Sequence, residues 1–525
     1  MPTIDTLFAN LGPKYTVPRD IQRDILGQLL RDRPRVALVE APTGIGKSAV
    51  AVAYGHALLQ DHERSQLPDD VWPQSVVLTA TISLQQQYEA DFLAMQLVKG
   101  RGHYDCLANG LSAAEGVCTI YKDAECESPY YEVRSRARMS DRVVANYALY
   151  LNELFHGQGF LGSKKRRALL VCDEAHRLLD QLTEFEKRKL DAGLASELGF
   201  KVAGWESMGR ASVWAQENLT LIQDRLMMAV TQGDKSARQW LTLFRQASAM
   251  ATVPDTFICL KTGPMVEAAP LWPRQSADVL FRSAEHILLQ SATMYGGHLL
   301  AELLGLNPIE KQGEQEDVPY NYYAAPSPFN PNRWPVHFRP VVDLNARSTD
   351  EEWGRMSEVV HEYVHNFHQT KGVIHITAAN QVDRSLAAVR RCLGCEHRVL
   401  APQPGLPRAH LLSQYRNSAN GTWLCHYSVG EGESFDDDSA RIQLIVKTPF
   451  PDLSDRLIKL RSEDSTIGKK LYAGMTLAKV GQIAGRVMRH PKDYGETIIL
   501  DGTFRRLWSW HKTLAPGWLH TVLRF

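Results

Sequence analysis

The sequence has no net charge, no long hydrophobic run and few cysteines. Its 59 Lys and Arg residues balance 59 Asp and Glu residues, so any contact with nucleic acid must come from a local basic surface. No apolar run approaches the roughly 20 residues that span a bilayer, and the first residues lack the layout of a secretory signal. We therefore expect no membrane partner and a cytoplasmic location, where eight unevenly spread cysteines do not predict disulfides.

The length of 525 residues predicts several domains. Short apolar runs alternate with helical patterns near residues 36–78 and again near residues 372–500, which predicts two α/β lobes with parallel sheets. Residues 181–251 show only helical patterns and predict an inserted helical subdomain. Residues 319–335 are rich in Pro and Asn and predict the connector between the lobes.

A phosphate-binding loop follows the first apolar run, residues 36–39. Glycines allow the backbone N–H groups of such a loop to point inward at phosphates. Lys47 adds a positive charge for the outer phosphates and Ser48 a hydroxyl for Mg²⁺, although Ala41 replaces the first Gly of the usual pattern. We expect the cradle to consist of Thr43, Gly44, Ile45, Gly46, Lys47 and Ser48.

Two acids follow a second apolar run, residues 169–172, in the tetrad Asp-Glu-Ala-His. The run predicts a buried parallel strand. An acid at the end of such a strand can hold Mg²⁺ through water, and the next acid can orient or deprotonate the attacking water. We assign Asp173 to Mg²⁺ and Glu174 to the water.

The second lobe carries the cationic groups that a triphosphate needs. Residues 476–489 predict a helix on which Arg486 and Arg489 share one face. An arginine that reaches across a cleft contributes about 10³–10⁵ in rate to phosphoryl transfer. The expected catalytic set is Lys47, Asp173, Glu174, Gln482, Arg486 and Arg489.

The collinear order of these motifs resembles that of the XPD/DinG-type superfamily 2 DNA helicases, a DEAH-box family with an iron–sulfur domain. The resemblance runs along nearly the whole chain. It implies that Arg19 and Gln22 contact adenine, and that residues 78–81 with Leu84 and Gln85 touch the DNA backbone. The resemblance also implies that residues 291–293 couple hydrolysis to movement. In residues 432–436 a glycine that the family usually has is missing. The other matching segments are residues 327–333, 449–451 and 482–489, the last followed by Asp493, Gly495 and Asp501.

The resemblance implies two RecA-like parallel-sheet motor domains that are interrupted by two insertions. The expected domains are residues 1–99 (motor domain 1, first part), 100–140 (cysteine-rich iron–sulfur-type insertion), 141–180 (motor domain 1 with the DEAH box), 181–253 (helical arch-type insertion), 254–318 (motor domain 1, final part) and 319–525 (motor domain 2).

Three cysteines, Cys106, Cys118 and Cys126, lie where the family places its iron–sulfur cluster. Such a cluster normally takes four thiolates, so the fourth ligand is open between Asp105, His103 and a carboxylate near Cys126. A three-iron cluster and a metal-free domain stay as alternatives.

A second cysteine pair, Cys392 and Cys395 with His397 nearby, suggests zinc. A structural zinc site needs a second pair of ligands, and the sequence shows none close to this one. We therefore expect these cysteines to bind no metal.

Aromatic and basic residues interleave before Asn146, which suits stacking and phosphate contacts with a single strand, although a solvated helix face is an equal alternative. The residues concerned are Tyr130, Tyr131, Arg134, Arg136, Arg138 and Arg142.

The function implied by the resemblance is an ATP-dependent DNA helicase of 5′→3′ polarity that uses ATP and Mg²⁺. It implies single-stranded and tailed duplex DNA as partners and a monomer, with RNA open as a track. Two other functions stay open. One is an ATP-driven translocase or remodeller that does not separate strands, and the other is a nucleotide-gated nucleic-acid-binding module with little turnover.

Overall fold

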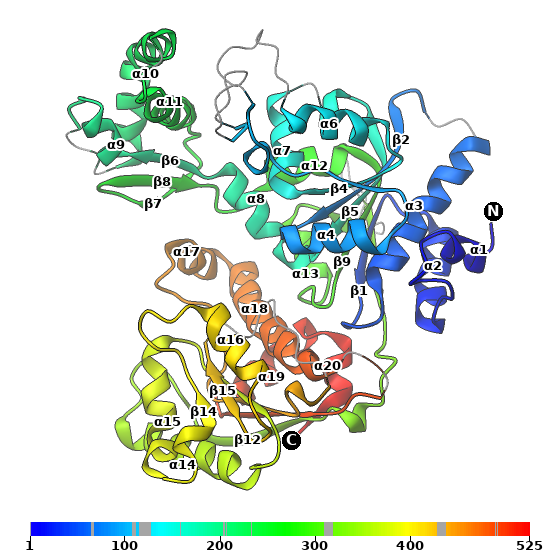
Figure 1. Ribbon diagram of the computed structural model, residues 1–525, viewed down its shortest axis with the longest axis vertical. Coiled ribbons are helices and arrows are strands. Elements are labelled where there is room, and N and C mark those ends of the chain that lie inside the picture. The colour runs from blue at the N-terminus through cyan, green and yellow to red at the C-terminus, as the bar shows by residue number, and fades with distance from the viewer. Residues whose placement is uncertain are drawn as a thin grey trace.

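The computed structural model describes residues 2–64, 68–107, 112–114, 128–157, 159–202, 205, 207–232, 234–308, 319–427, 437–488, 490 and 492–525. Within these residues the chain forms two parallel sheets and one small antiparallel sheet. Figure 1 shows two lobes one above the other, with the small sheet extending sideways from the upper lobe. No helix of the described residues is long and apolar enough to cross a membrane. Cys118, Cys126, Arg489 and residues 432–436 lie outside the described residues.

The first lobe has a parallel sheet with a hydrophobic core on each face. Alternate residues of a strand point to opposite faces, so Val36 and Leu38 enter one core while Ala37 and Val39 enter the other. The strand order is β10 (Asn307–Pro308), β11 (Pro319–Ala324), β1 (Val36–Glu40), β9 (Ala284–Ser291), β5 (Arg166–Asp173), β2 (Val71–Thr79), β4 (Arg142–Asn146), β3 (Met95–Leu97). The helices include α1 (Ile4–Ala9), α2 (Asp20–Asp32), α3 (Lys47–Arg64), α4 (Ile82–Asp91), α6 (Pro129–Met139), α7 (Tyr147–His156), α8 (Leu178–Glu186), α12 (Arg274–Arg282) and α13 (His298–Leu303).

The second lobe repeats this architecture, which confirms the predicted pair of α/β lobes. Its two cores again lie on opposite faces of the sheet, with Ile499 in one and Ile498 in the other. The strand order is β14 (Val399–Leu400), β15 (Trp423–His426), β13 (Gly372–His375), β16 (Ile442–Ile445), β17 (Glu496–Asp501), β12 (Val336–Val342), β18 (Leu523–Arg524). The helices include α14 (Asp350–Asn366), α15 (Val382–Arg391), α16 (Arg408–Arg416), α17 (Arg456–Asp464), α18 (Thr466–Ala484), α19 (Phe504–His511) and α20 (Gly517–Val522).

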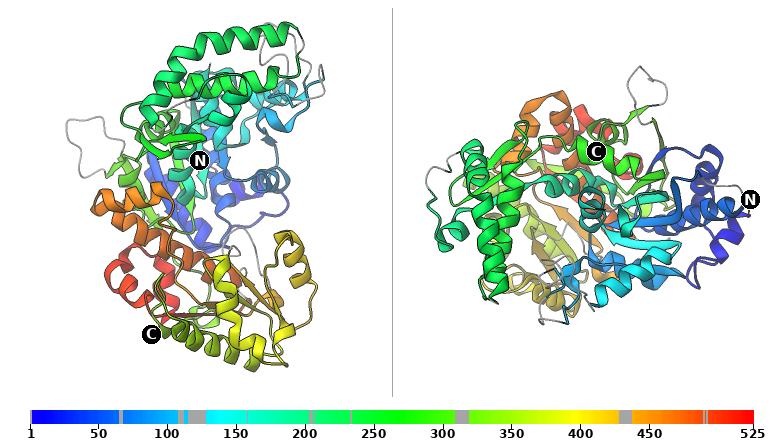
Figure 2. Two further views of the ribbon diagram at one scale, coloured as in Figure 1. Left: turned by 90° about the vertical axis from the view of Figure 1, so that its left-hand side faces the viewer. Right: turned by 90° about the horizontal axis from the view of Figure 1, so that it is seen from above.

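The insertion after α8 is not wholly helical, so that prediction was wrong. Strand β6 (Arg188–Asp191) pairs with β8 (Met265–Ala269), which also pairs with β7 (Ile258–Lys261), all antiparallel. Leu190 and Val266 share a core with the helices, so this unit extends past the expected end at residue 253. Strand β6 was missed because three helices separate it in sequence from its partner β8. Figure 2 shows the long helices α10 (Met208–Thr231) and α11 (Ala237–Ala251) side by side, and α9 (Ala192–Glu197) completes the unit.

The expected connector at residues 319–335 also needs correction. Its first part is β11, which lies between β10 and β1 in the first sheet, so the first lobe continues past residue 318. Tyr320 pairs with Val36 and is buried. Pro319 is tolerated because it is the first residue of the strand, where a missing N–H costs little. The prolines and asparagines that follow form the actual connection between the lobes.

Candidate nucleotide site between the two lobes

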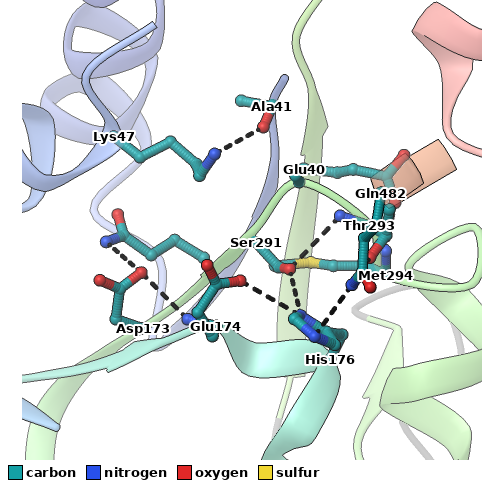
Figure 3. A network of polar contacts seen from close by, with 12 residues as sticks. Glu40, Ala41, Lys47, Asp173, Glu174, His176, Ser291, Thr293, Met294 and Gln482 are labelled. Carbon is teal, nitrogen blue, oxygen red and sulfur yellow. Dashed lines mark hydrogen bonds and ion pairs between the residues drawn. The ribbon is translucent and has the colours of Figure 1, made fainter. Parts of the chain in front are cut away.

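The loop between β1 and α3 has the geometry of a phosphate cradle. Gly44 and Gly46 have φ values of 80° and 82°, which favour glycine. A Cβ on Gly46 would lie 2.4 Å from Nε2 of Gln22, so the packing also requires glycine there. Lys47 Nζ donates to the carbonyl oxygens of Ala41 (2.9 Å) and Pro42 (3.1 Å), and Figure 3 shows this side chain folded over the loop. The start of α3 adds a positive helix end to the cradle.

Arg19 and Gln22 both hold the same loop from the side of α2. Arg19 donates to the carbonyl of Gly44, and Gln22 Nε2 donates to the carbonyl of Ile45 at 2.8 Å. Gln22 is also the third residue of α2, where its Oε1 accepts from the backbone N–H of Arg19 at 2.8 Å. The structure therefore places the two predicted adenine contacts beside the cradle, and their contact with adenine stays a prediction.

The buried carboxylate of Asp173 ends β5 close to the loop. Its Oδ2 accepts from the hydroxyl of Tyr88 at 2.9 Å, and its Oδ1 accepts from Nε2 of Gln290 at 3.0 Å. Burial raises the pKa of Asp173, and the negative charge of Glu174 raises it further. Tyr88 and Gln290 were missed in the sequence, because nothing marks an interior polar residue of α4 or β9 as a partner of a distant acid.

The carboxyl group of Glu174 stays ionised in this environment. Burial by itself raises the pKa of Glu174, but the hydrogen bond with His176 and the charges of His176, Lys47 and Arg177 lower it to about 2. Its side chain is 39% exposed, so the carboxylate faces the cleft. The backbone of Glu174 is left-handed, with φ of 52°, and this turns the chain sharply after the strand.

Polar side chains from both lobes meet at His176 (Figure 3). His176 Nδ1 lies 2.8 Å from Oγ of Ser291, at the end of β9. Gln482 Nε2, on α18 of the second lobe, lies 3.0 Å from His176 Nε2 and 3.4 Å from Oγ1 of Thr293. Beside this group, Thr43 Oγ1 of the cradle donates to the carbonyl of Gly485 at 3.3 Å. Four segments that are far apart in sequence therefore form one polar network at the cleft.

Known protein families are similar to this chain in sequence, and solved structures are similar to it in fold. Residues 19–192 match the DEAD/DEAH box helicase family, and residues 361–521 match the helicase C-terminal domain family. A solved structure titled "XPD_Helicase" covers 97% of this chain and 99% of its own, with a TM-score of 0.61 and 14% identity. One titled "Structure of S. tokodaii Xpd4" covers 94% and 97%, with a TM-score of 0.53 and 14% identity.

The chain contains a DEAD/DEAH box helicase domain and a helicase C-terminal domain.

Two curated relatives of this helicase match over shorter stretches. The "Regulator of telomere elongation helicase 1 homolog" of Anopheles gambiae is 29% identical over 111 residues, which cover 19% of this chain and 11% of the relative. The "Fanconi anemia group J protein homolog" of Gallus gallus is 30% identical over 105 residues, which cover 18% of this chain and 8% of the relative. The aligned stretches thus span about a tenth of the length of these relatives.

The end of α18 differs from the prediction for this helicase. The helix stops at Ala484, and Gly485–Val487 form a single 3₁₀ turn, so Arg486 does not lie on the α-helix, and Arg489 lies outside the described residues. Glycine weakens a helix, and here the carbonyl of Gly485 instead accepts from Thr43. Arg486 is buried, and its charge acts on His375 at the end of β13.

Two residues expected to touch DNA are buried in the helicase fold. Gln85 on α4 has no solvent-exposed surface, so it cannot contact a DNA backbone in this arrangement. Arg142 on β4 is buried too, and its guanidinium contacts His56 and the carbonyl of Leu93. In both cases the sequence pattern did not show that the side chain faces the interior of the fold and not the solvent.

Of the other residues of that series, Tyr131, Arg134 and the buried Tyr130 line a large cleft, whereas Arg136 and Arg138 do not. This cleft has a volume of about 1230 Å³ and lies between the region of α6 and the helices of the insertion. Arg134 lies at its wall and forms an ion pair with Glu153 at 3.0 Å. Basic and aromatic lining residues include Arg101, Tyr131, Arg134, Arg188, Phe244 and Arg245.

Of the three cysteines expected to bind an iron–sulfur cluster, only Cys106 lies in the described residues. Cys106 is buried. Ser128 caps α6: its Oγ donates to the carbonyl of Asp105 at 2.8 Å and accepts from the N–H of Tyr130. Cys118 and Cys126, the other two expected thiol ligands, lie outside the described residues.

The reason for expecting no metal at Cys392 and Cys395 does not hold in the structure. His361 and His365 on α14 lie beside Cys392 and Cys395, so the second ligand pair that the sequence seemed to lack exists in space. It was missed because the two pairs are separated by the whole of β13 and α15. His397, the predicted companion of the cysteines, is not in this group.

Proposed function

We propose that this protein is an ATP-dependent DNA helicase that translocates on single-stranded DNA and unwinds duplex. The observation that carries the proposal is the contact of Gln482 with His176 and Thr293, which joins the second lobe to the acids of the first. A nucleotide in this cleft touches both lobes, so its binding and hydrolysis alter the contact between them.

In this mechanism the first lobe binds the triphosphate and prepares the water. Lys47 leaves the carbonyls of Ala41 and Pro42 to pair with the outer phosphates. Glu174, which stays ionised, orients the attacking water and takes its proton. Arg19 and Gln22 flank the base, while the backbone N–H groups of residues 43–48 surround the phosphates.

Mg²⁺ would be held by the hydroxyl of Ser48 and, through water, by the carboxylate of Asp173. These are the hard oxygen donors that Mg²⁺ prefers, and the ion would neutralise phosphate charge there. The fit rests on the buried Asp173 carboxylate, whose hydrogen bonds from Tyr88 and Gln290 fix its orientation.

The second lobe completes the site. Gln482 contacts His176, which pairs with Glu174, so changes at this acid alter the contact between the lobes. Arg486 and Arg489 stabilise the negative charge of the transition state. Arg486 reaches the phosphates from the 3₁₀ turn that follows α18. The first residue of this turn, Gly485, already contacts Thr43 of the cradle. An arginine in this role adds about 10³–10⁵ in rate.

The single strand crosses both lobes and passes through the cleft beside α6. Tyr131 and Phe244 offer ring faces on which bases of any sequence can stack, and Arg134 and Arg245 face the phosphates. The polarity 5′→3′ comes from the family alone, as does action as a monomer.

A strand-displacement assay tests this function. The wild-type protein is expected to unwind a 5′-tailed duplex with ATP and Mg²⁺ but not a 3′-tailed one, while releasing phosphate in a DNA-dependent manner. Phosphate release and movement without displacement would instead indicate a translocase, and tight binding with negligible phosphate release would indicate a binding module.

An iron–sulfur cluster held by Cys106, Cys118 and Cys126 stays part of the proposal. It is tested by the visible absorption of protein purified without oxygen, with iron and sulfide measured on the same sample. A colourless, iron-free protein that still unwinds DNA would remove the cluster and leave the motor intact.

A further inference from the structure

Two histidines and two cysteines come together at the end of the second lobe that is remote from the nucleotide site. His361 and His365 lie one turn apart on α14, and Cys392 and Cys395 lie in the turn that follows α15. One ligand atom from each residue lies within 4.8 Å of the other three. In Figure 1 the helices α14 and α15 form the part of the lower lobe farthest from the first lobe.

The spacing of these atoms fits one tetrahedral metal ion. Bonds of 2.3 Å to sulfur and 2.0–2.1 Å to nitrogen place the ligand atoms of a zinc tetrahedron about 3.3–3.8 Å apart. Cys395 Sγ lies 3.7 Å from Nδ1 of His365, which is already close to such an edge. No two of the four ligand atoms are more than 4.8 Å apart, so side-chain movements of about 1 Å bring them to these distances.

The backbone holds both ligand pairs in place without a metal. Residues four apart on a helix lie on one face, which brings the rings of His361 and His365 to 5.8 Å. The N–H groups of Cys395 and Glu396 both donate to the carbonyl of Cys392, at 2.9 and 3.0 Å, and this closes the turn between the cysteines. Both pairs also lie at helix C-termini, where a cation is favoured.

An unpaired nitrogen points to a missing ligand. Nε2 of His361 is buried and has no hydrogen-bond partner among the described residues. A buried polar atom left without a partner costs about 1–3 kcal/mol, and nearly all such atoms in folded proteins have one. A metal ion bound to this ring would satisfy it.

We propose that His361, His365, Cys392 and Cys395 bind one zinc ion with a structural role. Two thiolates and two imidazoles are ligands that select zinc. The protein fills all four positions, so no site is open for substrate or water, and this is typical of structural zinc. A two-iron cluster with the same ligands is disfavoured, because its histidines and cysteines bind different irons and lie farther apart.

The zinc ion fastens α14 to α15. These helices pack on the same core of the second sheet through Val360 and Val389. The ion pairs Arg391–Glu358 (2.6 Å) and Arg384–Asp350 (2.7 Å) also join them, but these side chains are exposed and such pairs contribute little. The N–H of Ala388 donates to Oγ of Ser357 at 2.7 Å, and a closed metal site adds a stronger link at the ends of both helices.

Metal analysis of the full-length protein tests the proposal. Protein from zinc-supplied cells, washed without strong chelator, is expected to contain about one zinc per chain, and the double variant C392S/C395S less than about a tenth of that. The matched controls are His397→Gln, two residues from the site, and Cys259→Ser, a described cysteine in the insertion. Both are expected to retain zinc, because neither belongs to the group.

Two further measurements keep the proposal testable if the double variant folds poorly. His365→Cys keeps four good ligands and is expected to retain zinc, whereas His365→Gln loses it. Replacement of zinc by Co²⁺ in the wild-type protein should give the strong visible bands of tetrahedral cobalt–thiolate. A wild-type protein that binds neither zinc nor cobalt, that holds iron lost in C392S/C395S, or whose Cys392 and Cys395 are joined as a disulfide would overturn the proposal.

Discussion

Nε2 of Gln482 lies 3.0 Å from Nε2 of His176, so a side chain of the second lobe contacts the histidine that pairs with Glu174. In the neutral ring, Nε2 accepts from this amide N–H and Nδ1 carries the proton. Nδ1 faces Ser291 Oγ at 2.8 Å and Glu174 Oε2 at 3.3 Å. A residue of the second lobe thus positions the ring that orients the proposed base of the first lobe.

Gln482→Ala is therefore expected to slow hydrolysis more than it weakens ATP binding. Loss of one hydrogen bond worth about 0.5–1.5 kcal/mol predicts up to about a tenfold fall in kcat for DNA-stimulated ATP hydrolysis, with little change in KM. Phosphate-release kinetics with saturating single-stranded DNA measure this. Lys470→Ala, an exposed residue of the same helix, is the control and should match wild type. An unchanged kcat in Gln482→Ala would show that the contact does not couple the lobes.

Lys47→Ala is expected to abolish turnover without loss of DNA binding. The side chain donates to the loop carbonyls of Ala41 and Pro42, bonds that it gives up when it pairs with phosphate, so its removal is expected to leave the cradle folded. Loss of one group that stabilises transition-state charge costs about 10²–10³ in kcat. Phosphate release and fluorescence anisotropy with labelled single-stranded DNA separate the two effects. Lys14→Ala, a lysine paired with Asp91 on the surface, is the matched control, and full turnover by Lys47→Ala would refute the assignment.

The parts of this site that could be predicted from the sequence are those built by local rules. A strand, a glycine loop and a helix start are contiguous in the sequence, so the pattern of residues 36–48 is enough to predict the phosphate cradle. The acids after residues 169–172 were assigned for the same reason, since the carboxyl ends of parallel strands meet at one edge of a sheet. Both predictions depend on a few neighbouring residues and need no knowledge of distant contacts.

The parts that could not be predicted depend on tertiary contacts. Tyr88 and Gln290 hold Asp173 from other strands and helices, and no local pattern distinguishes them from ordinary interior polar residues. The end of α18 was misplaced because Gly485 gives its carbonyl to Thr43 of the other lobe. The histidine pair of α14 was overlooked because its cysteine partners follow a different helix.

The buried His375 makes the second lobe sensitive to acid. Burial lowers the pKa of His375 to about 4, and the charges of Arg486 and His426 act in the same direction, against the hydrogen bond with Gln443. The unfolded chain binds this proton near pH 6.5. Stability is therefore complete above about pH 6.5 and falls as the pH drops toward 4, by up to about 3 kcal/mol.

His375→Gln removes this titration and keeps a side-chain donor for Gln443. The difference in unfolding free energy between wild type and variant is expected to shrink between pH 6.5 and 4, measured by denaturant titration at several pH values. His410→Gln, an exposed residue of α16, should instead follow the wild-type profile. Parallel curves for His375→Gln and wild type would place the acid sensitivity elsewhere.

Arg245→Ala tests the cleft beside α6 as the path of the single strand. Arg245 lines this cleft from α11, in a chain whose charges otherwise balance, so its contribution should appear as a local salt-dependent contact. Each phosphate contact to a single strand adds about 0.7 to the slope of log K against log salt. The variant is expected to reduce affinity and to lower the steepness of this slope by about 0.7, measured by anisotropy between low and moderate salt. Arg225→Ala, an exposed arginine of α10 that does not line the cleft, should leave the slope unchanged, and equal slopes for both variants would place the strand on another surface.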